Sequence, residues 1–163
     1  MTTNDAVYTK DIDKKTLHVV RSFAASLEQV WKAWTESEML DKWWAPKPYR
    51  AETKTMDFRV GGYWLYCMMG PKGDNQWCRE SYKKIEPRQA IHNDTNFCDA
   101  DGNISNDFPT MHWTKDFRGD TKETTVSIEI LFDSVADMDT VVKKGFREGF
   151  AAGLNNLEEL LSI

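Results

Sequence analysis

Three histidines and three cysteines are the side chains of this 163-residue sequence best suited to nucleophilic, acid–base or metal chemistry. His18, His92 and His112 are far apart and form no ligand pair at helical spacing, and the sequence contains no HExxH motif. The cysteines form no CxxC pair and leave an odd thiol, which favours reduced cysteines over a disulfide framework. No GxSxG, P-loop or GxGxxG motif is present. We therefore predict no catalytic residue, no metal site and no cofactor.

Aromatic and thioether side chains with a few polar groups are the mixture that orients an apolar ligand. The sequence holds seven tryptophans, eight phenylalanines and seven methionines, for which a plain aromatic core is the alternative explanation. Side chains alternate along a strand, so Trp77 and Arg79 share one face and Cys78 and Glu80 the other, and the sequence does not decide which pair faces inward. The predicted ligand-binding residues are Trp44, Tyr66, Met68, Trp77, Arg79, His92, Trp113, Phe146 and Phe150.

The last stretch of the chain must position this set, because it carries the most regular apolar pattern. From Val135 to Ile163, apolar residues recur at helical spacing, which predicts one long amphipathic helix. Ser134 is suited to the N-cap, and Asp137 and Asp139 place negative charge in the first turn. Lys144 falls outside the apolar face. That face consists of Met138, Val142, Phe146, Phe150, Leu154, Leu157 and Leu161.

Three glycines, Gly145, Gly149 and Gly153, lie at i, i+4 and i+8 on the apolar face of the predicted helix. Each costs about 1 kcal/mol relative to alanine in a helix interior, so packing or function must compensate. Either a curved sheet presses its backbone or its large side chains against the helix, or the missing side chains leave room for a small molecule. The two explanations can hold together.

The rest of the chain is predicted to form strands and two short helices. A capping box at Ser26 and Gln29 starts a helix that ends at Thr35, and a second short helix covers residues 37–43. Residues 1–13 carry little pattern and are expected to form a ragged lead-in. Strands are predicted at 16–23, 49–58, 63–69, 76–85, 90–98, 110–117 and 124–132.

These elements predict an α+β fold in one domain over residues 1–163. Tight turns join consecutive strands, so the curved sheet of about six to seven strands is antiparallel and wraps on the long C-terminal helix. A strongly curved sheet leaves a gap beside a straight helix, where we expect a closed pocket of about 300 Å³ or more. Trp43 and Trp44, at the end of the short helices, either line this gap or wedge those helices under the sheet, and we favour the wedge.

Four short motifs, in this order, carry a resemblance to a known family. They are Trp43-Trp44-Ala45-Pro46, Asp57-Phe58-Arg59-Val60-Gly61-Gly62-Tyr63-Trp64, Met68-Met69-Gly70-Pro71-Lys72-Gly73 and Ile85-Glu86-Pro87-Arg88. From about Lys15 to Ile163 the chain resembles the Hsp90-ATPase-activator-homologue-1-like proteins of the START-like, or Bet v 1-like, helix-grip superfamily. Phe58 and Val60 depart from the Leu and Pro that the family more often shows. Asp57 and Arg59 share one side of the chain, where we expect an ion pair that braces the turn.

The resemblance implies the helix-grip fold and several functions. Bacterial members of the family are similar to a module of the eukaryotic co-chaperone that stimulates the Hsp90 ATPase. The wider superfamily mostly binds hydrophobic or amphipathic molecules such as lipids, sterols, polyketides and aromatic compounds. A few branches are cyclases or hydrolases.

Composition excludes several classes of function. The formal net charge of −5, with no run of Lys or Arg, argues against a nucleic-acid partner. No window of 18 uncharged apolar residues predicts a membrane span, and the polar N-terminus lacks the apolar segment of a signal peptide. We therefore expect a cytoplasmic protein, and a homodimer is left open.

Three functions remain as hypotheses. The first is non-enzymatic binding of a hydrophobic or aromatic, lipid-like small molecule in a cavity between the sheet and the C-terminal helix. The second is an Hsp90-type co-chaperone or ATPase-activator module, which needs an exposed charged or apolar patch for its chaperone partner. The third is a small cyclase or hydrolase that uses His92 or His112 as acid or base in the pocket.

Overall fold

The computed structural model describes residues 6–162 and contains eight strands and four helices within that range. The strands are β1 Val7–Asp11, β2 Thr16–Phe23, β3 Arg50–Met56, β4 Tyr63–Met69, β5 Asn75–Glu86, β6 Ala90–Cys98, β7 Met111–Gly119 and β8 Thr124–Leu131. The helices are α1 Leu27–Thr35, α2 Ser37–Trp43, α3 Val135–Lys143 and α4 Phe146–Leu161. No helix within residues 6–162 is long and apolar enough to cross a membrane.

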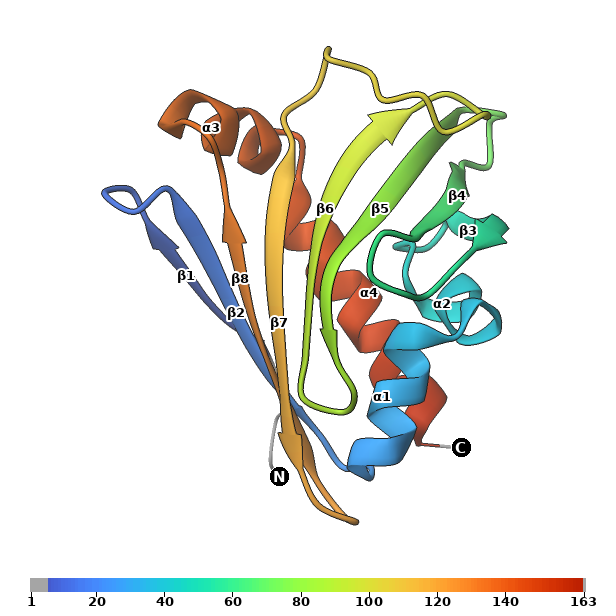
Figure 1. The fold of residues 1–163 in the computed structure, drawn as a ribbon, viewed down its shortest axis with the longest axis vertical. Helices are drawn as coiled ribbons and strands as arrows, with labels where there is room; N and C mark the ends of the chain where they lie inside the picture. Colours follow the sequence, from blue (N-terminus) through green and yellow to red (C-terminus); the bar gives the residue numbers. More distant parts are fainter. Residues whose placement is uncertain (1–5, 163) are drawn as a thin grey trace.

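All eight strands pair antiparallel in one curved sheet, in the order β1-β2-β8-β7-β6-β5-β4-β3. Figure 1 shows this sheet curving in front of α4, with α1 and α2 beside the lower half of that helix and α3 near the upper end of β8. The predicted α+β architecture is confirmed, with one strand more than the upper end of the predicted range. The sheet and the helices enclose one apolar core.

The inner face of β8 shows how the sequence pattern builds that core. Val126, Ile128 and Ile130 are at most 2% exposed, while the residues between them face outward. Leu154 and Leu157 of α4 are fully buried in the same core. The alternation of the last strand and the helical repeat of the last helix therefore meet, as the sequence predicted.

The two short helices form as predicted. The Ser26 hydroxyl accepts the Gln29 backbone N–H, and the Gln29 side chain accepts the Ser26 N–H, which completes the capping box of α1. Trp43 at the end of α2 is fully buried, and its Nε1–H donates to the Ala33 carbonyl oxygen at 2.8 Å. Trp43 therefore packs α2 against α1, and the wedge of both helices under the sheet stays a prediction.

The prediction of one long helix from Val135 to Ile163 is wrong. The chain breaks between α3 and α4, where Gly145 adopts a φ of +89°. Glycine reaches this left-handed conformation at little steric cost because it has no β-carbon. The Lys144 and Gly145 N–H groups close the last turn of α3 on Thr140, Val141 and Val142 carbonyls. The helix start is confirmed, since the Ser134 hydroxyl accepts the Asp137 N–H at 3.0 Å.

The expected lead-in over residues 1–13 is wrong for Val7–Asp11, which forms β1 and pairs with β2 along its whole length. Val7 is 64% exposed, and edge strands of this kind show no clean apolar alternation. The pattern-based prediction therefore missed the strand. Residues 1–5 of the predicted lead-in lie outside the described residues.

Candidate functional site

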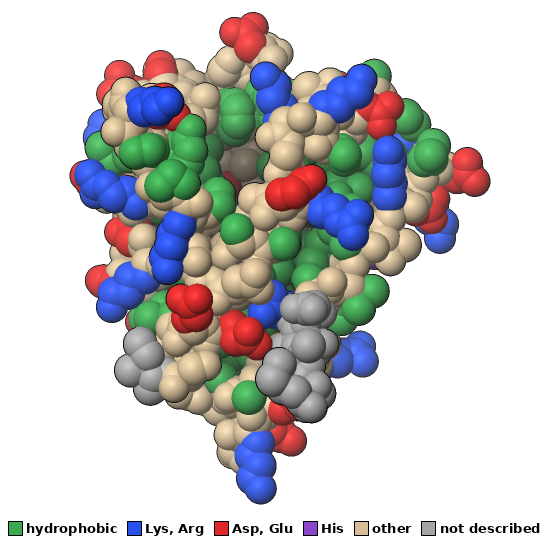
Figure 2. Space-filling view, turned by 180° about the vertical axis from the view of Figure 1, so that it is seen from behind, with side chains coloured by type: hydrophobic (Ala, Val, Ile, Leu, Met, Phe, Trp, Pro, Cys, Tyr) green, Lys and Arg blue, Asp and Glu red, His purple; other side chains and the backbone are tan. Residues whose placement is uncertain are grey.

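A cavity of about 240 Å³ lies between α4 and the inner face of the sheet. Figure 2, which looks onto the α4 side, shows the surface hollowed near the top of the view, with hydrophobic side chains beside the opening. The cavity is therefore open to solvent and smaller than the closed pocket of about 300 Å³ that was expected. Large aromatic side chains occupy much of the gap that the sheet leaves beside the helix.

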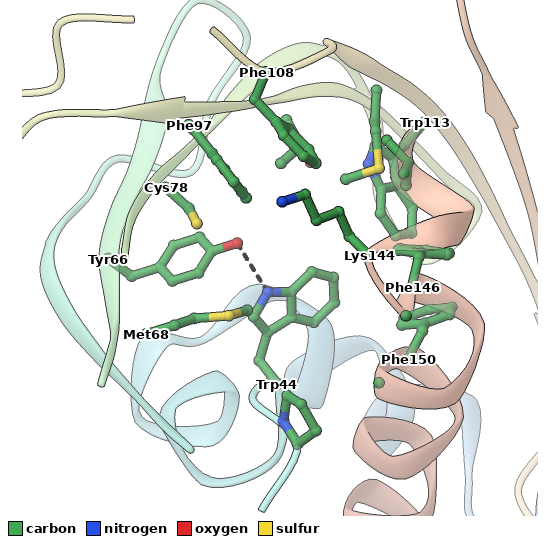
Figure 3. Close-up of a pocket in the computed structure, with 16 residues that line it drawn as sticks. Trp44, Tyr66, Met68, Cys78, Phe97, Phe108, Trp113, Lys144, Phe146 and Phe150 are labelled. Carbon is green, nitrogen blue, oxygen red and sulfur yellow. Dashed lines mark hydrogen bonds between the residues drawn. The ribbon is translucent and has the colours of Figure 1, made fainter. Parts of the chain in front are cut away.

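Aromatic rings from four different elements form the cavity walls (Figure 3). Phe146 and Phe150, one turn apart on α4, stack with ring centroids 5.4 Å apart, and the Trp113 ring on β7 meets the Phe150 ring edge-on at 5.4 Å. Across the cavity, Phe97 of β6 stacks on Phe108 with centroids 4.0 Å apart. Each wall thus offers ring faces and edges to an apolar guest.

A chain of hydrogen bonds fixes the side chains of the inner wall of the cavity. The Trp44 Nε1–H donates to the Tyr66 hydroxyl at 2.9 Å, and that hydroxyl donates to Glu80 at 2.8 Å. The Asn93 amide and the Thr95 hydroxyl also donate to Glu80, which is 1% exposed. Because all three partners of the carboxylate are donors, this arrangement suits an ionised Glu80. The chain fixes the Trp44 and Tyr66 rings where they line the cavity.

Lys115 on β7 is a buried cation whose charge acts on Glu80. Burial lowers the pKa of Lys115 to about 8, opposed by the Glu80 charge. Burial raises the pKa of Glu80, opposed by Lys115 and by the three hydrogen bonds. The Lys115 ammonium lies 4.9–5.5 Å from the ring centroids of Trp34, Trp44 and Trp113. Neither charged group lines the cavity, so both act from behind its wall.

The three glycines, Gly145 before α4 and Gly149 and Gly153 within it, test the two explanations drawn from the sequence. A β-carbon at Gly153 would lie 3.1 Å from the Trp44 carbonyl oxygen, so a side chain there would require the neighbouring backbone to shift. The backbone that presses against the helix is the end of α2, and the expectation that the sheet does so is wrong. Gly145 and Gly149 instead line the cavity.

Six of the nine predicted ligand-binding residues line the cavity: Trp44, Tyr66, Met68, Trp113, Phe146 and Phe150. The structure places Trp77, Arg79 and His92 outside it, and their predicted position is wrong. Arg79 lies over the Tyr63 ring at 4.1 Å and donates to the Gly102 carbonyl oxygen at 3.1 Å. Alternation along the strand then turns Cys78 and Glu80 inward, the opposite of the pair in the predicted ligand-binding set.

The histidines do not support an acid–base site in the cavity. His92 alternates with the buried Ile91 and Asn93 on β6, and therefore faces the outer side of the sheet. His112 lies on the same outer side, where its Nδ1 is 2.8 Å from Asp94 and its Nε2 is 3.0 Å from Asp133. The cyclase or hydrolase hypothesis that relied on these two side chains is therefore wrong about their position.

Sequence reasoning missed several lining residues for identifiable reasons. Phe97 lies on β6, whose two faces are both partly buried, so alternation gives no clear signal. Phe108 comes from the polar loop before β7, and only its stacking on Phe97 brings it over the cavity. Lys144 was assigned to the polar face of a continuous helix, and the break at Gly145 places it on the cavity. The other missed lining residues are Pro46, Cys78, Thr95, Met111 and Val141, whereas Gly145 and Gly149 were already candidates for leaving room for a small molecule.

Comparison with known proteins identifies one family. The family described as "Activator of Hsp90 ATPase homolog 1-like protein" matches residues 24–162 of the chain. A search of curated proteins finds no match. The family match thus covers every helix and all strands except β1 and β2.

Solved structures share the whole fold. A protein from Arthrobacter aurescens is 26% identical with a TM-score of 0.90, over 96% of this chain and 91% of that chain. A protein from Mycobacterium smegmatis is 24% identical with a TM-score of 0.87, over 96% of both chains. The AHSA1 protein from Silicibacter pomeroyi is 17% identical with a TM-score of 0.70, over 90% of this chain and 97% of that chain. These likenesses confirm the helix-grip fold and carry no statement of function.

Proposed function

We propose that this chain, which belongs to the Activator of Hsp90 ATPase homolog 1-like family, binds a hydrophobic or aromatic small molecule in the cavity between the sheet and α4. The observation that carries the proposal is the cavity itself, since seven of its sixteen lining residues are aromatic. Concave apolar sites with a few polar groups are the usual form of small-molecule sites.

The size of the cavity limits the ligand. An apolar cavity of about 150 Å³ accepts benzene, so the 240 Å³ found here suits one or two fused rings or a short alkyl chain. The Trp44 Nε1–H is already hydrogen-bonded to the Tyr66 hydroxyl, and that hydroxyl donates to Glu80, so these groups leave the inner wall apolar toward a ligand. A compact aromatic compound therefore fits better than a long lipid.

Direct binding tests the proposal. Isothermal titration calorimetry with 2-naphthalenemethanol should give saturable binding, with the negative heat-capacity change that accompanies apolar burial. Gly149→Leu should remove this binding, because a side chain at Gly149 would enter the cavity. Glu148→Leu is the matched control, since Glu148 is exposed on the same helix and does not line the cavity.

Two results would overturn the proposal. One is the absence of measurable binding to the unaltered protein. The other is equal binding by Gly149→Leu and Glu148→Leu, since that would place the compound elsewhere. Native mass spectrometry of the protein as purified from cells adds an independent readout, because a retained molecule of matching size would be displaced by 2-naphthalenemethanol.

A co-chaperone role is the second candidate, and a surface feature supports it. Ile12 and Leu131 are 56% and 40% exposed, and Val135 is 36% exposed near the same end of the sheet. The Lys10–Asp139 ion pair, at 3.2 Å, ties β1 to α3 beside them. Exposed apolar side chains of this kind are available to a protein partner, and the family description names an activator of the Hsp90 ATPase.

An ATPase assay separates this candidate from the first. The protein should stimulate a purified Hsp90-type chaperone, and Ile12→Asp should weaken the stimulation. Val60→Asp is the control, because Val60 is 58% exposed on the β3–β4 turn at the other edge of the sheet. No stimulation and no binding to the chaperone would remove the co-chaperone role without affecting the cavity proposal.

A further inference from the structure

Lys144 is the one charged residue among the sixteen that line the cavity. Its backbone closes the last turn of α3, and its side chain runs along the mouth of the cavity toward the space between Tyr66 and Phe97 (Figure 3). Among residues 6–162, no carboxylate lies within 4.0 Å of its ammonium group, whereas lysines such as Lys10 and Lys47 form ion pairs. A cation without a carboxylate partner therefore stands at the entrance of an apolar site.

The helix break at Gly145 is what brings Lys144 to this position. In a continuous helix with the repeat of this sequence, Lys144 would lie on the polar face, away from the core. Gly145 with φ +89° ends α3 and redirects the chain into α4, and the residues on both sides of it then line the cavity. The neighbouring Lys143 is also exposed but does not line the cavity.

We infer that the ligand is an anionic amphiphile: a compact aromatic or short apolar body that enters the cavity and one carboxylate or similar anionic group that pairs with Lys144 at the mouth. The inference rests on the proposed cavity binding and adds its head-group chemistry. An ammonium beside apolar walls forms stronger charge-assisted contacts than one fully surrounded by water. The ordinary alternative is a lysine whose stem covers apolar surface while its charge only faces water.

Three probes with one ring system and different head groups distinguish these alternatives. They are 2-naphthoate, 2-naphthalenemethanol and 2-naphthylmethylammonium, measured by calorimetry near neutral pH and at low salt. The anion should bind roughly three- to tenfold more tightly than the alcohol, and the cation more weakly than both. Added salt should reduce the preference for the anion, because the pair is accessible to solvent.

Two variants assign the preference to one side chain. Lys144→Gln should bring the affinities for anion and alcohol to within about twofold of each other. Lys143→Gln removes the same charge one residue earlier and should keep the preference of the unaltered protein. Both substitutions are at exposed helix-end positions, so both variants should fold.

The outcomes separate the two proposals. If all three probes bind with equal affinity, or if Lys144→Gln keeps the preference for the anion, the head-group inference is wrong and the cavity proposal stands. If Lys144→Gln and Lys143→Gln lose the preference equally, general surface charge explains it and the inference is also wrong. If none of the probes binds, the cavity proposal fails and the inference fails with it.

Discussion

Gly153 of α4 lies directly against the carbonyl oxygen of Trp44, which a β-carbon at Gly153 would approach to 3.1 Å. The Asn156 amide donates to the Ala45 carbonyl oxygen at 3.1 Å one turn further along the helix. These contacts dock the end of α2 on α4, and they hold Trp44 where its ring lines the cavity. The absence of a side chain at Gly153 is thus a condition for the shape of the site.

Substitutions of two helix glycines should have opposite effects on stability. Gly149→Ala should raise the free energy of unfolding by up to about 1 kcal/mol through helix propensity, because its β-carbon meets only Pro46 at 3.7 Å. Gly153→Val should lower it by about 1–3 kcal/mol through overpacking against backbone. Urea denaturation measures both. Equal effects at the two positions would mean that the α2–α4 contact accommodates a side chain at Gly153 without strain.

The Glu80–Lys115 charges should be strongly coupled. Both side chains are buried, and each charge opposes the shift that burial imposes on the pKa of the other, so Glu80→Gln and Lys115→Met should each be destabilising. The double variant should lose much less than the sum of the two. A double-mutant cycle by chemical denaturation gives the coupling free energy directly. Additive losses would show that the two side chains act independently.

Lys115 should also make stability depend on pH in the alkaline range. Its pKa in the folded protein is lowered to about 8, below the usual lysine value of about 10.4. Between these values the unfolded chain binds more protons than the folded one, so the contribution to stability rises with pH. The free energy of unfolding relative to Lys115→Met should therefore increase from pH 8 to pH 10. A constant difference across this range contradicts the lowered pKa.

His112 should give the opposite pH dependence. Partial burial alone would lower the pKa of His112, but hydrogen bonds and charges from Asp94 and Asp133 outweigh it and raise the pKa. The stabilisation is then complete below the unfolded pKa of about 6.5 and is lost as the pH rises through the raised value. The free energy of unfolding of the unaltered protein relative to His112→Gln should therefore decrease as the pH rises through this window. NMR titration of the His112 ring should find a pKa above the ordinary histidine value of about 6.5.

Local signals were sufficient to predict most of the fold. The bounds of β4 and β6 were predicted to the residue, because turn-forming residues flank both strands: Gly61-Gly62 and residues 70–74 beside β4, and Pro87 and the polar residues 99–103 beside β6. The Asp57 carboxylate and the Arg59 guanidinium lie 2.7 Å apart, so the predicted brace at that turn is confirmed. Such features depend only on neighbours in the sequence, and these are visible without coordinates.

The orientation of β5 and the break at Gly145 depend on distant partners and could not be predicted. Glu80 faces inward while Trp77 faces outward, and this becomes favourable only when Lys115, Tyr66 and Asn93 surround the carboxylate. The apolar spacing from Met138 to Leu161 continues across the break, so the pattern alone indicates one helix. These two features decide which side chains line the site, and for this reason the site was predicted less completely than the fold.

Phe108 should control how fast a ligand leaves the cavity. It is the lining residue from the loop between β6 and β7, and its ring stacks on Phe97 with centroids 4.0 Å apart and an interplanar angle of 11°. Phe108→Ala removes this contact, worth about 0.5–1.5 kcal/mol for an aromatic pair, and widens the opening. The dissociation rate of 2-naphthalenemethanol should rise by about fivefold or more, with little change in association, because variants of one site differ mainly in dissociation.

The matched control for this prediction is Ile104→Ala. Ile104 is in the same loop and 47% exposed, it does not line the cavity, and its bridge to Cys98 is made by the backbone. Stopped-flow measurement of tryptophan fluorescence follows both variants, since Trp44 and Trp113 line the cavity. Dissociation from Ile104→Ala should match that from the unaltered protein. Equal acceleration in both variants would indicate a general loosening of the loop, and no acceleration in Phe108→Ala would mean that the ligand leaves by another route.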